Sequence, residues 1–379
     1  MNRPMTSEQR SNNVSGHHKG LDGIRGIAIL GVMAVHFVRT PIPQNTFEKI
    51  ITKAAGWGGL GVELFFVLSG FLITGILIDS KRDAHFFRNF YARRTLRIFP
   101  LYFGILAVLL LLLPQITSHL GILEPARENQ IWLWTYTANY YIASEGSWAL
   151  GPLSHFWTLA IEEHFYLFWP FVVFFLSRTT LERMSVLVVV TALSIRLYLE
   201  WLAPDSLINV ITPCKIDAMC VGALFASRIR FPKTSVFRVS KISSLVLIVM
   251  IVALSVAGDF YENIDNYLQE IRETVIMFLF AILIIWGIDT PWRPRYFGIL
   301  ADNRLLRFFG KYSYGVYVYH GIITWYLDES VTLMFASILG SHTLGLLAKI
   351  LFATVVSVLI SWLSFEFFEK KFLKLKRYF

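Results

Sequence analysis

Residues 21–37 read LDGIRGIAILGVMAVHF, an apolar stretch about as long as one membrane span that carries Arg25 and His36. An ionisable side chain among lipid tails costs roughly 2.5–3.5 kcal/mol, so such groups usually face a bundle interior and serve function. Eleven helical steps of about 100° and 1.5 Å return to within about 20° of the start and advance about 16 Å. The spacing predicts one helix with Arg25 near one membrane face and His36 deeper on the same stripe. In the alternative interpretation, Arg25 extends to the lipid headgroups, His36 bonds a backbone carbonyl, and neither residue serves function.

The composition indicates an all-α membrane protein. Hydrophobic residues make up 55% of the chain and charged residues 16%, whereas soluble domains carry about 25% charge. We therefore expect a polytopic helical bundle. The two cysteines, Cys214 and Cys220, lie in one apolar segment without metal-ligand spacing, so we expect them to pack in the core and expect no metal site.

Ten candidate spans follow from the apolar segments, at about residues 21–40, 58–78, 98–114, 155–177, 184–202, 213–229, 242–257, 273–288, 313–328 and 344–365. Of the 35 Lys and Arg residues, 26 fall in the segments that share a side with the N-terminus, and five fall opposite. By the positive-inside rule both termini are cytoplasmic. The basic residues follow span ends and form no continuous face, so we expect no nucleic-acid partner.

One membrane domain, residues 21–370, is expected between two cytoplasmic tails. Residues 1–20 are polar and lack the features of a cleaved signal peptide, and residues 371–379 are basic. Residues 115–154 form the longest external stretch and are rich in Trp and Tyr. Their aromatic rings suit either a belt at headgroup level or a surface on which sugar rings stack.

Five ordered motifs carry a resemblance to a known family. They are the R-x10-H pattern from Arg25 to His36, GGLGVELFFVLSGFLI at 58–73, RRTLRIFPLY at 93–102, WTLAIEEHFY at 157–166 and GKYSYGVYVYH at 310–320. From about residue 20 onward the chain resembles the acyltransferase-3 family of integral membrane acyltransferases, in the short form without an extracytoplasmic hydrolase-like domain. It departs from the family pattern at Thr158, His164 and Lys371, where Ser, Gln and Pro are common.

The resemblance implies transfer of an acyl group, which we expect to be acetyl, from acyl-CoA to a hydroxyl of a carbohydrate or lipid-linked glycan. It also implies a location in the bacterial cytoplasmic (inner) membrane. Such transfer needs a base to take the acceptor proton, and the unperturbed pKa of His, about 6.5, suits that role near neutral pH. We expect His36 to be this base, Glu162 to orient or polarise it, and Arg25 to hold the pantetheine or the thioester carbonyl.

The donor site is expected at Arg94 and Arg97, three residues apart at the cytoplasmic start of the span at 98–114. Arginine forks match phosphate oxygens, and a helix N-terminus adds positive charge. The ligand that needs such a site is coenzyme A, as the resemblance also implies. Positive-inside topology alone remains the alternative.

For the acceptor, His155 and Glu162 lie seven residues apart, nearly on one helical face, which favours a shared polar pocket. Further substrate-binding candidates are Glu163, Trp157, Tyr166, His320 and Asp217. For Glu162 and Glu163 the alternative is a solvated pair at the membrane edge. For His320 it is packing, and for Asp217 it is an internal ion pair with Lys215.

A glycan or lipid transporter without acyl-transfer chemistry is the alternative function. Transporters often show two similar halves with broken helices at matching positions, and the sequence contains no such repeat. A sensor or scaffold without catalytic activity would not explain why Arg25 and His36 lie in an apolar segment.

Overall fold

The computed structural model describes residues 18–39, 43–116, 121–204, 206–230, 236–261, 264–288 and 293–379. These residues are helical or lie in turns and contain no strand, which confirms the all-α prediction. Most of the predicted tail at 1–20 lies outside them.

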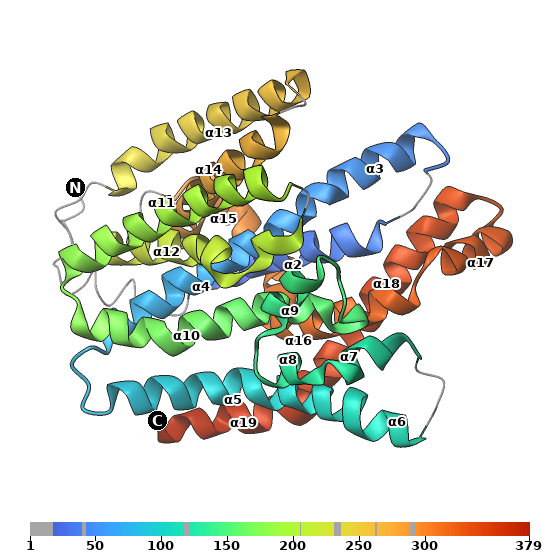
Figure 1. Ribbon diagram of the computed structural model, residues 1–379, viewed down its shortest axis with the longest axis horizontal. Helices are drawn as coiled ribbons and strands as arrows, with labels where there is room; N and C mark the ends of the chain where they lie inside the picture. Colours follow the sequence, from blue (N-terminus) through green and yellow to red (C-terminus); the bar gives the residue numbers. More distant parts are fainter. Residues whose placement is uncertain are drawn as a thin grey trace. The chain divides into compact units, whose positions relative to one another are not determined.

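The chain divides into two compact units, each built from three stretches of sequence. Unit 1 comprises Met1–Ile24, Glu63–Phe86 and Leu159–Asn303, and unit 2 comprises Arg25–Val62, Phe87–Thr158 and Arg304–Phe379. The helices can be followed by their labels and colours in Figure 1.

The longer helices of unit 1 are α4 (Leu60–Asp79), α10 (Trp157–Phe175), α11 (Arg178–Leu202), α12 (Thr212–Ile229), α13 (Val236–Phe260) and α14 (Asp265–Gly287). Those of unit 2 are α2 (Lys19–Phe37), α3 (Thr46–Gly56), α5 (Phe86–Leu106), α16 (Arg304–Tyr326), α17 (Glu329–Leu339) and α18 (His342–Ser364). Within unit 1, α11 packs along α12 and α13 along α14; within unit 2, α18 packs against both α16 and α17.

Among the residues that the structure describes, six helices are long and apolar enough to cross a membrane, and a seventh span results if the bent pair α16 and α17 is one span. These match seven of the predicted spans, so the described residues support an integral membrane protein. The predicted spans at 213–229 and 273–288 correspond to α12 and α14, which carry several charged residues. The described apolar part of α13, Ser243–Gly258, is shorter than a full span.

Buried ion pairs explain why α12 and α14 tolerate charge inside unit 1. Arg196 of α11 contacts Asp217 of α12 at 2.7 Å and Glu270 of α14 at 2.6 Å, and Arg196 and Asp217 are fully buried. Lys215 lies 3.3 Å from Glu63 and 3.1 Å from Glu273. Each charge therefore meets an opposite charge, which is the usual condition for burying one.

Unit 2 is held by close helix contacts and by aromatic packing. A Cβ on Gly58 would lie 2.1 Å from the Gly31 carbonyl oxygen, so the backbone of α2 approaches residue 58 more closely than any side chain allows. Tyr102 of α5 is fully buried, stacks on Tyr136 at 4.2 Å and donates a 2.7 Å hydrogen bond to the Leu133 carbonyl. Its hydroxyl is thereby satisfied inside the core.

Candidate functional site

Arg25 and His36 lie on one continuous helix, α2, as the sequence predicts. The His36 Nδ1 is 2.7 Å from the Val32 carbonyl oxygen. Because a carbonyl can only accept, Nδ1 carries the proton and Nε2 of the neutral ring keeps its lone pair. His36 is half-buried.

Two further histidines of unit 2 lie near His36: His320 contacts His36, and His155 contacts His320. The centroid of the His320 ring lies 5.0 Å from that of His36 and 5.4 Å from that of His155, with edge-to-face geometry in both pairs. His320 is fully buried between two half-buried rings. We call His36, His155 and His320 the histidine cluster.

Hydrogen bonds place a proton on Nδ1 of His36 and of His320, whereas both ring nitrogens of His155 face carbonyls. His320 Nδ1 donates to the Tyr317 carbonyl at 2.6 Å, whereas its buried Nε2 makes no hydrogen bond. His155 Nδ1 lies 3.0 Å from the Pro152 carbonyl oxygen and Nε2 lies 3.2 Å from that of Val318. A neutral ring donates only one of these bonds, whereas an imidazolium donates both.

The backbone of His155 is anchored to α16. The Tyr317 hydroxyl donates to the His155 carbonyl at 2.7 Å and bonds the Thr158 hydroxyl at 2.5 Å. Gly321 provides the space for the ring, since a Cβ there would lie 2.3 Å from His155 Nδ1. Thr158 stands where Ser is common in the family pattern and keeps the hydroxyl group, which is hydrogen-bonded here to Tyr317.

His155 lies in the 3-10 segment η4 (Gly151–Phe156), which runs directly into α10 at Trp157. Pro152 and Gly151, whose φ is 54°, stand at the start of this segment. A tighter turn of about 120° per residue over two steps shifts the offset between His155 and Glu162 by only about 40°, so the helical spacing is kept. The shared pocket of His155 and Glu162 and the pairing of Glu162 with His36 stay predictions.

The remaining acceptor candidates divide between the two units. In unit 1, Glu162 accepts a 2.8 Å hydrogen bond from the Tyr166 hydroxyl, which also bonds Ser69, and Glu163 follows on the same helix. In unit 2, Trp157 packs against Trp148 with ring centroids 6.5 Å apart.

Asp217 forms the buried pair with Arg196 described above, rather than one with Lys215. This contact favours the structural interpretation of Asp217, and its proposed contact with substrate stays a prediction. His164, where the family pattern has Gln, lies 2.7 Å from the Thr212 hydroxyl through Nδ1.

Arg94 and Arg97 lie on α5, as predicted, but well inside it, because the helix begins at Phe86. The effect of a helix dipole is confined to the first turn, so the expected contribution of the N-terminus is absent. A residue that the sequence did not single out joins them: Lys376, near the C-terminus, experiences electrostatic repulsion from Arg93, Arg94 and Arg97. Its only sequence signal was the basic character of residues 371–379.

Tyr317, which anchors His155, lies within the motif at 310–320 and three residues before His320. Among the described residues, no three His, Cys, Asp or Glu side chains are arranged to hold a metal ion.

Comparison with known proteins identifies the family of the chain. The model of a family described as "Acyltransferase domain" matches residues 18–366. A Staphylococcus aureus (strain COL) protein named "Putative O-acetyltransferase" is 26% identical over 361 residues, which cover 84% of this chain and 55% of that protein. "O-acetyltransferase OatA" of Staphylococcus aureus (strain NCTC 8325) is 26% identical over 326 residues, 79% of this chain and 49% of the relative. The chain thus spans about half the length of these curated relatives. No solved structure matches it.

The family model covers nearly the whole described chain and includes all three residues of the histidine cluster. The apolar helices agree with a membrane location. The chain therefore belongs to the acyltransferase-3 family, and its enzyme class is that of the acyltransferases.

Proposed function

We propose that the protein is an O-acyltransferase that moves an acetyl group from acetyl-CoA to a hydroxyl of a carbohydrate or lipid-linked glycan, with His36 as the general base. The observation that carries this proposal is the hydrogen bond from His36 Nδ1 to the Val32 carbonyl, which leaves Nε2 as an acceptor. The names of the relatives support the choice of an oxygen acceptor and an acetyl group.

In the proposed reaction, His36 Nε2 takes the proton from the acceptor hydroxyl. The acceptor oxygen then forms a bond to the thioester carbonyl carbon, the carbon–sulfur bond breaks, and the His36 imidazolium returns its proton to the thiolate of coenzyme A. The products are an ester and free coenzyme A, so atoms and charge balance.

The donor phosphates are assigned to Arg94 and Arg97, whose planar forks suit phosphate oxygens. Lys376 lies near these arginines. Arg25 lies on the His36 helix and is assigned to the pantetheine or the thioester carbonyl. The distribution of Lys and Arg supports ten spans, two cytoplasmic termini and entry of the donor from the cytoplasm of a bacterial inner membrane.

A transporter is less well supported. One helix pair, α16 and α17, is bent by 74° at a short break, but the described residues contain no second pair bent in this way. Broken-helix transporters usually carry such breaks at matching positions of two repeats.

Release of coenzyme A tests the proposal. Vesicles containing the protein are mixed with acetyl-CoA and a cell-surface glycan extract, and free thiol is measured. We expect His36→Ala to insert normally and to lower turnover by about 10² to 10⁴, the usual range for loss of a general base. His85→Ala, which changes an exposed histidine outside the histidine cluster, is the matched control. Wild-type turnover by His36→Ala at normal abundance would exclude His36 as the base.

A further inference from the structure

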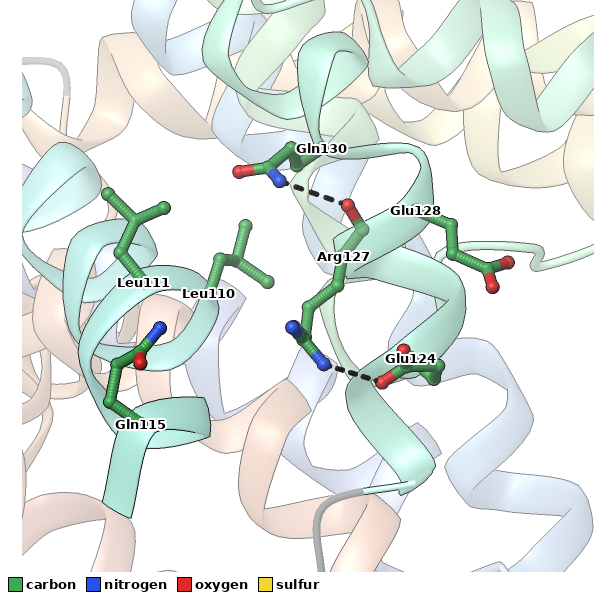
Figure 2. A pocket seen from close by; sticks show the side chains of 7 residues that line it. All are labelled: Leu110, Leu111, Gln115, Glu124, Arg127, Glu128 and Gln130. Atoms are coloured by element: carbon green, nitrogen blue, oxygen red, sulfur yellow. Dashed lines mark hydrogen bonds and ion pairs between the residues drawn. The ribbon is translucent and has the colours of Figure 1, made fainter. Parts of the chain in front are cut away.

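A cavity of about 390 Å³ lies in unit 2, beside the segment that follows α5. Its walls come from the π-helical segment η2 (Ala107–Leu112) and from α7 (Glu124–Glu128) with the residues that follow it (Figure 2). The volume is near the lower end of the range for small-molecule sites, about 300–1,000 Å³. It suits one or two sugar rings better than a coenzyme.

One wall of the cavity is polar and pre-organised. Arg127 Nη1 contacts Glu124 Oε2 at 2.8 Å, and the Gln130 amide nitrogen donates to the Arg127 carbonyl at 3.1 Å, as Figure 2 shows. The Trp134 indole donates to the Gln130 oxygen at 3.1 Å and so sets the amide orientation. Planar donors and acceptors held side by side match the neighbouring hydroxyls of a sugar, each of which donates and accepts.

The charge of this wall selects against anions. Arg127 is paired with Glu124, and Glu128, a second acidic residue, also lines the cavity. A phosphate or a uronate placed here would meet excess negative charge, which is unfavourable between groups a few ångströms apart. A neutral, hydroxyl-rich ring meets no such penalty.

The opposite wall carries two leucines and one polar residue, Gln115 of α6 (Leu113–Ile116), as Figure 2 shows. Leu110 and Leu111 line it from within η2, where the helix widens to the π form. Single π turns inside α-helices occur frequently at functional sites. A sugar ring has an apolar C–H face and a polar edge, so it can place one against the leucines and the other against the carboxylates and amides.

Packing links the cavity to the histidine cluster. Both α7 and the short segment η3 (Gly121–Leu123) pack against η4, which carries His155. The contact is close, because a Cβ on Gly151 would lie 3.1 Å from the Ile122 carbonyl oxygen. Binding at a part of the substrate that does not react is a common way to position the part that does.

We propose that this cavity binds a neutral sugar ring of the acceptor and disfavours anionic glycans. This assignment rests on the proposed function, which supplies a glycan as the acceptor. Beyond the proposed function, the assignment states where a sugar of the acceptor binds and that neutral sugars bind there better than anionic ones.

Ligand binding to the full chain in nanodiscs tests the cavity. Dissociation constants are measured by saturation-transfer NMR for a panel of neutral trisaccharides, including cellotriose and chitotriose, and for trigalacturonate. We expect at least one neutral trisaccharide to bind, with trigalacturonate about tenfold weaker. Loss of one hydrogen bond predicts that Gln130→Ala weakens neutral binding by about three- to tenfold. Glu128→Gln, which keeps the side-chain shape, is expected to narrow the gap between neutral and anionic sugars.

Glu145→Gln is the matched control, because Glu145 is exposed on α9 (Ala138–Glu145) and does not line the cavity. The cavity assignment is overturned if no neutral trisaccharide binds, if trigalacturonate binds as well as the neutral sugars, or if Gln130→Ala and Glu128→Gln both behave like Glu145→Gln. Release of coenzyme A is measured in the same nanodiscs. Normal sugar binding without any thioester cleavage by the wild-type protein would instead refute the proposed function and leave the cavity assignment intact.

Discussion

Gly321→Ala is expected to disrupt the histidine cluster without removing any of its side chains. The new methyl group would lie 2.3 Å from His155 Nδ1, 2.5 Å from Cε1 and 2.6 Å from Cγ, whereas ordinary contacts begin near 3.4 Å. The imidazole must therefore retreat by about 1 Å. Its bonds to the Pro152 and Val318 carbonyls, now 3.0 and 3.2 Å, cannot both survive that shift.

The magnitude follows from these losses. Overpacking a buried site costs about 1–3 kcal/mol, and each lost neutral hydrogen bond costs about 1 kcal/mol. We expect a destabilisation of about 2–4 kcal/mol. Turnover should fall by about 10²-fold, since misplacing site groups by about 1 Å has effects of that size.

The assay is a double-mutant cycle. Apparent melting temperature and coenzyme A release are measured for Gly321→Ala, His155→Ala and the double variant. Removal of the imidazole clears the space for the methyl group, so Gly321→Ala should cost almost no stability in the His155→Ala background. Gly56→Ala, at a site with no atom within 4 Å of the added Cβ, is the matched control. An equal stability cost in both backgrounds would refute the steric argument.

Three further predictions follow from the described contacts and charges. Arg196→Met should destabilise unit 1 by about 3–5 kcal/mol because it leaves Asp217 buried without its cation, and Arg196→Met with Asp217→Leu should recover part of that loss in a denaturation assay. Arg94→Ala and Arg97→Ala should each raise the apparent KM for acetyl-CoA, because each loses up to about 3 kcal/mol of binding free energy, and Lys at either position should restore part of the affinity. Lys376→Ala should also raise this KM. Unchanged KM values would mean that these cations only set the membrane topology. In sealed vesicles of known orientation, coenzyme A should appear on the cytoplasmic side and the acylated product on the other; product confined to the cytoplasmic side would contradict this arrangement.

The periodicity of the sequence was sufficient to predict some of the helices that carry site residues. The helix that carries Arg25 and His36, and the helical location of Arg94 and Arg97, followed from apolar length and a repeat of about 3.6 residues. Helix boundaries did not follow, because the helix of Arg94 continues toward its N-terminus through the polar residues after Phe86. Charged side chains exposed at a membrane edge do not end a helix, although they end the apolar signal.

Convergence of distant residues was only partly predictable. His36, His155 and His320 come from three separate stretches of the chain, and their edge-to-face contacts depend on tertiary packing that periodicity does not encode. His155 also lies in a 3-10 segment opened by a glycine with positive φ, which a helical-face argument cannot anticipate. The partner of Asp217 was not predictable for a similar reason, since Arg196 reaches it from another helix.

The buried pairs around Arg196 constrain the biogenesis of the protein. During synthesis α11 emerges with this guanidinium before α12 brings Asp217, and Glu270 arrives later with α14. No one of these helices can partition alone into lipid at low cost, because each carries a charge that only another neutralises. Because Asp217 and Glu270 follow Arg196 in the sequence, we expect Arg196 to be stably buried only after α12 and α14 have been made.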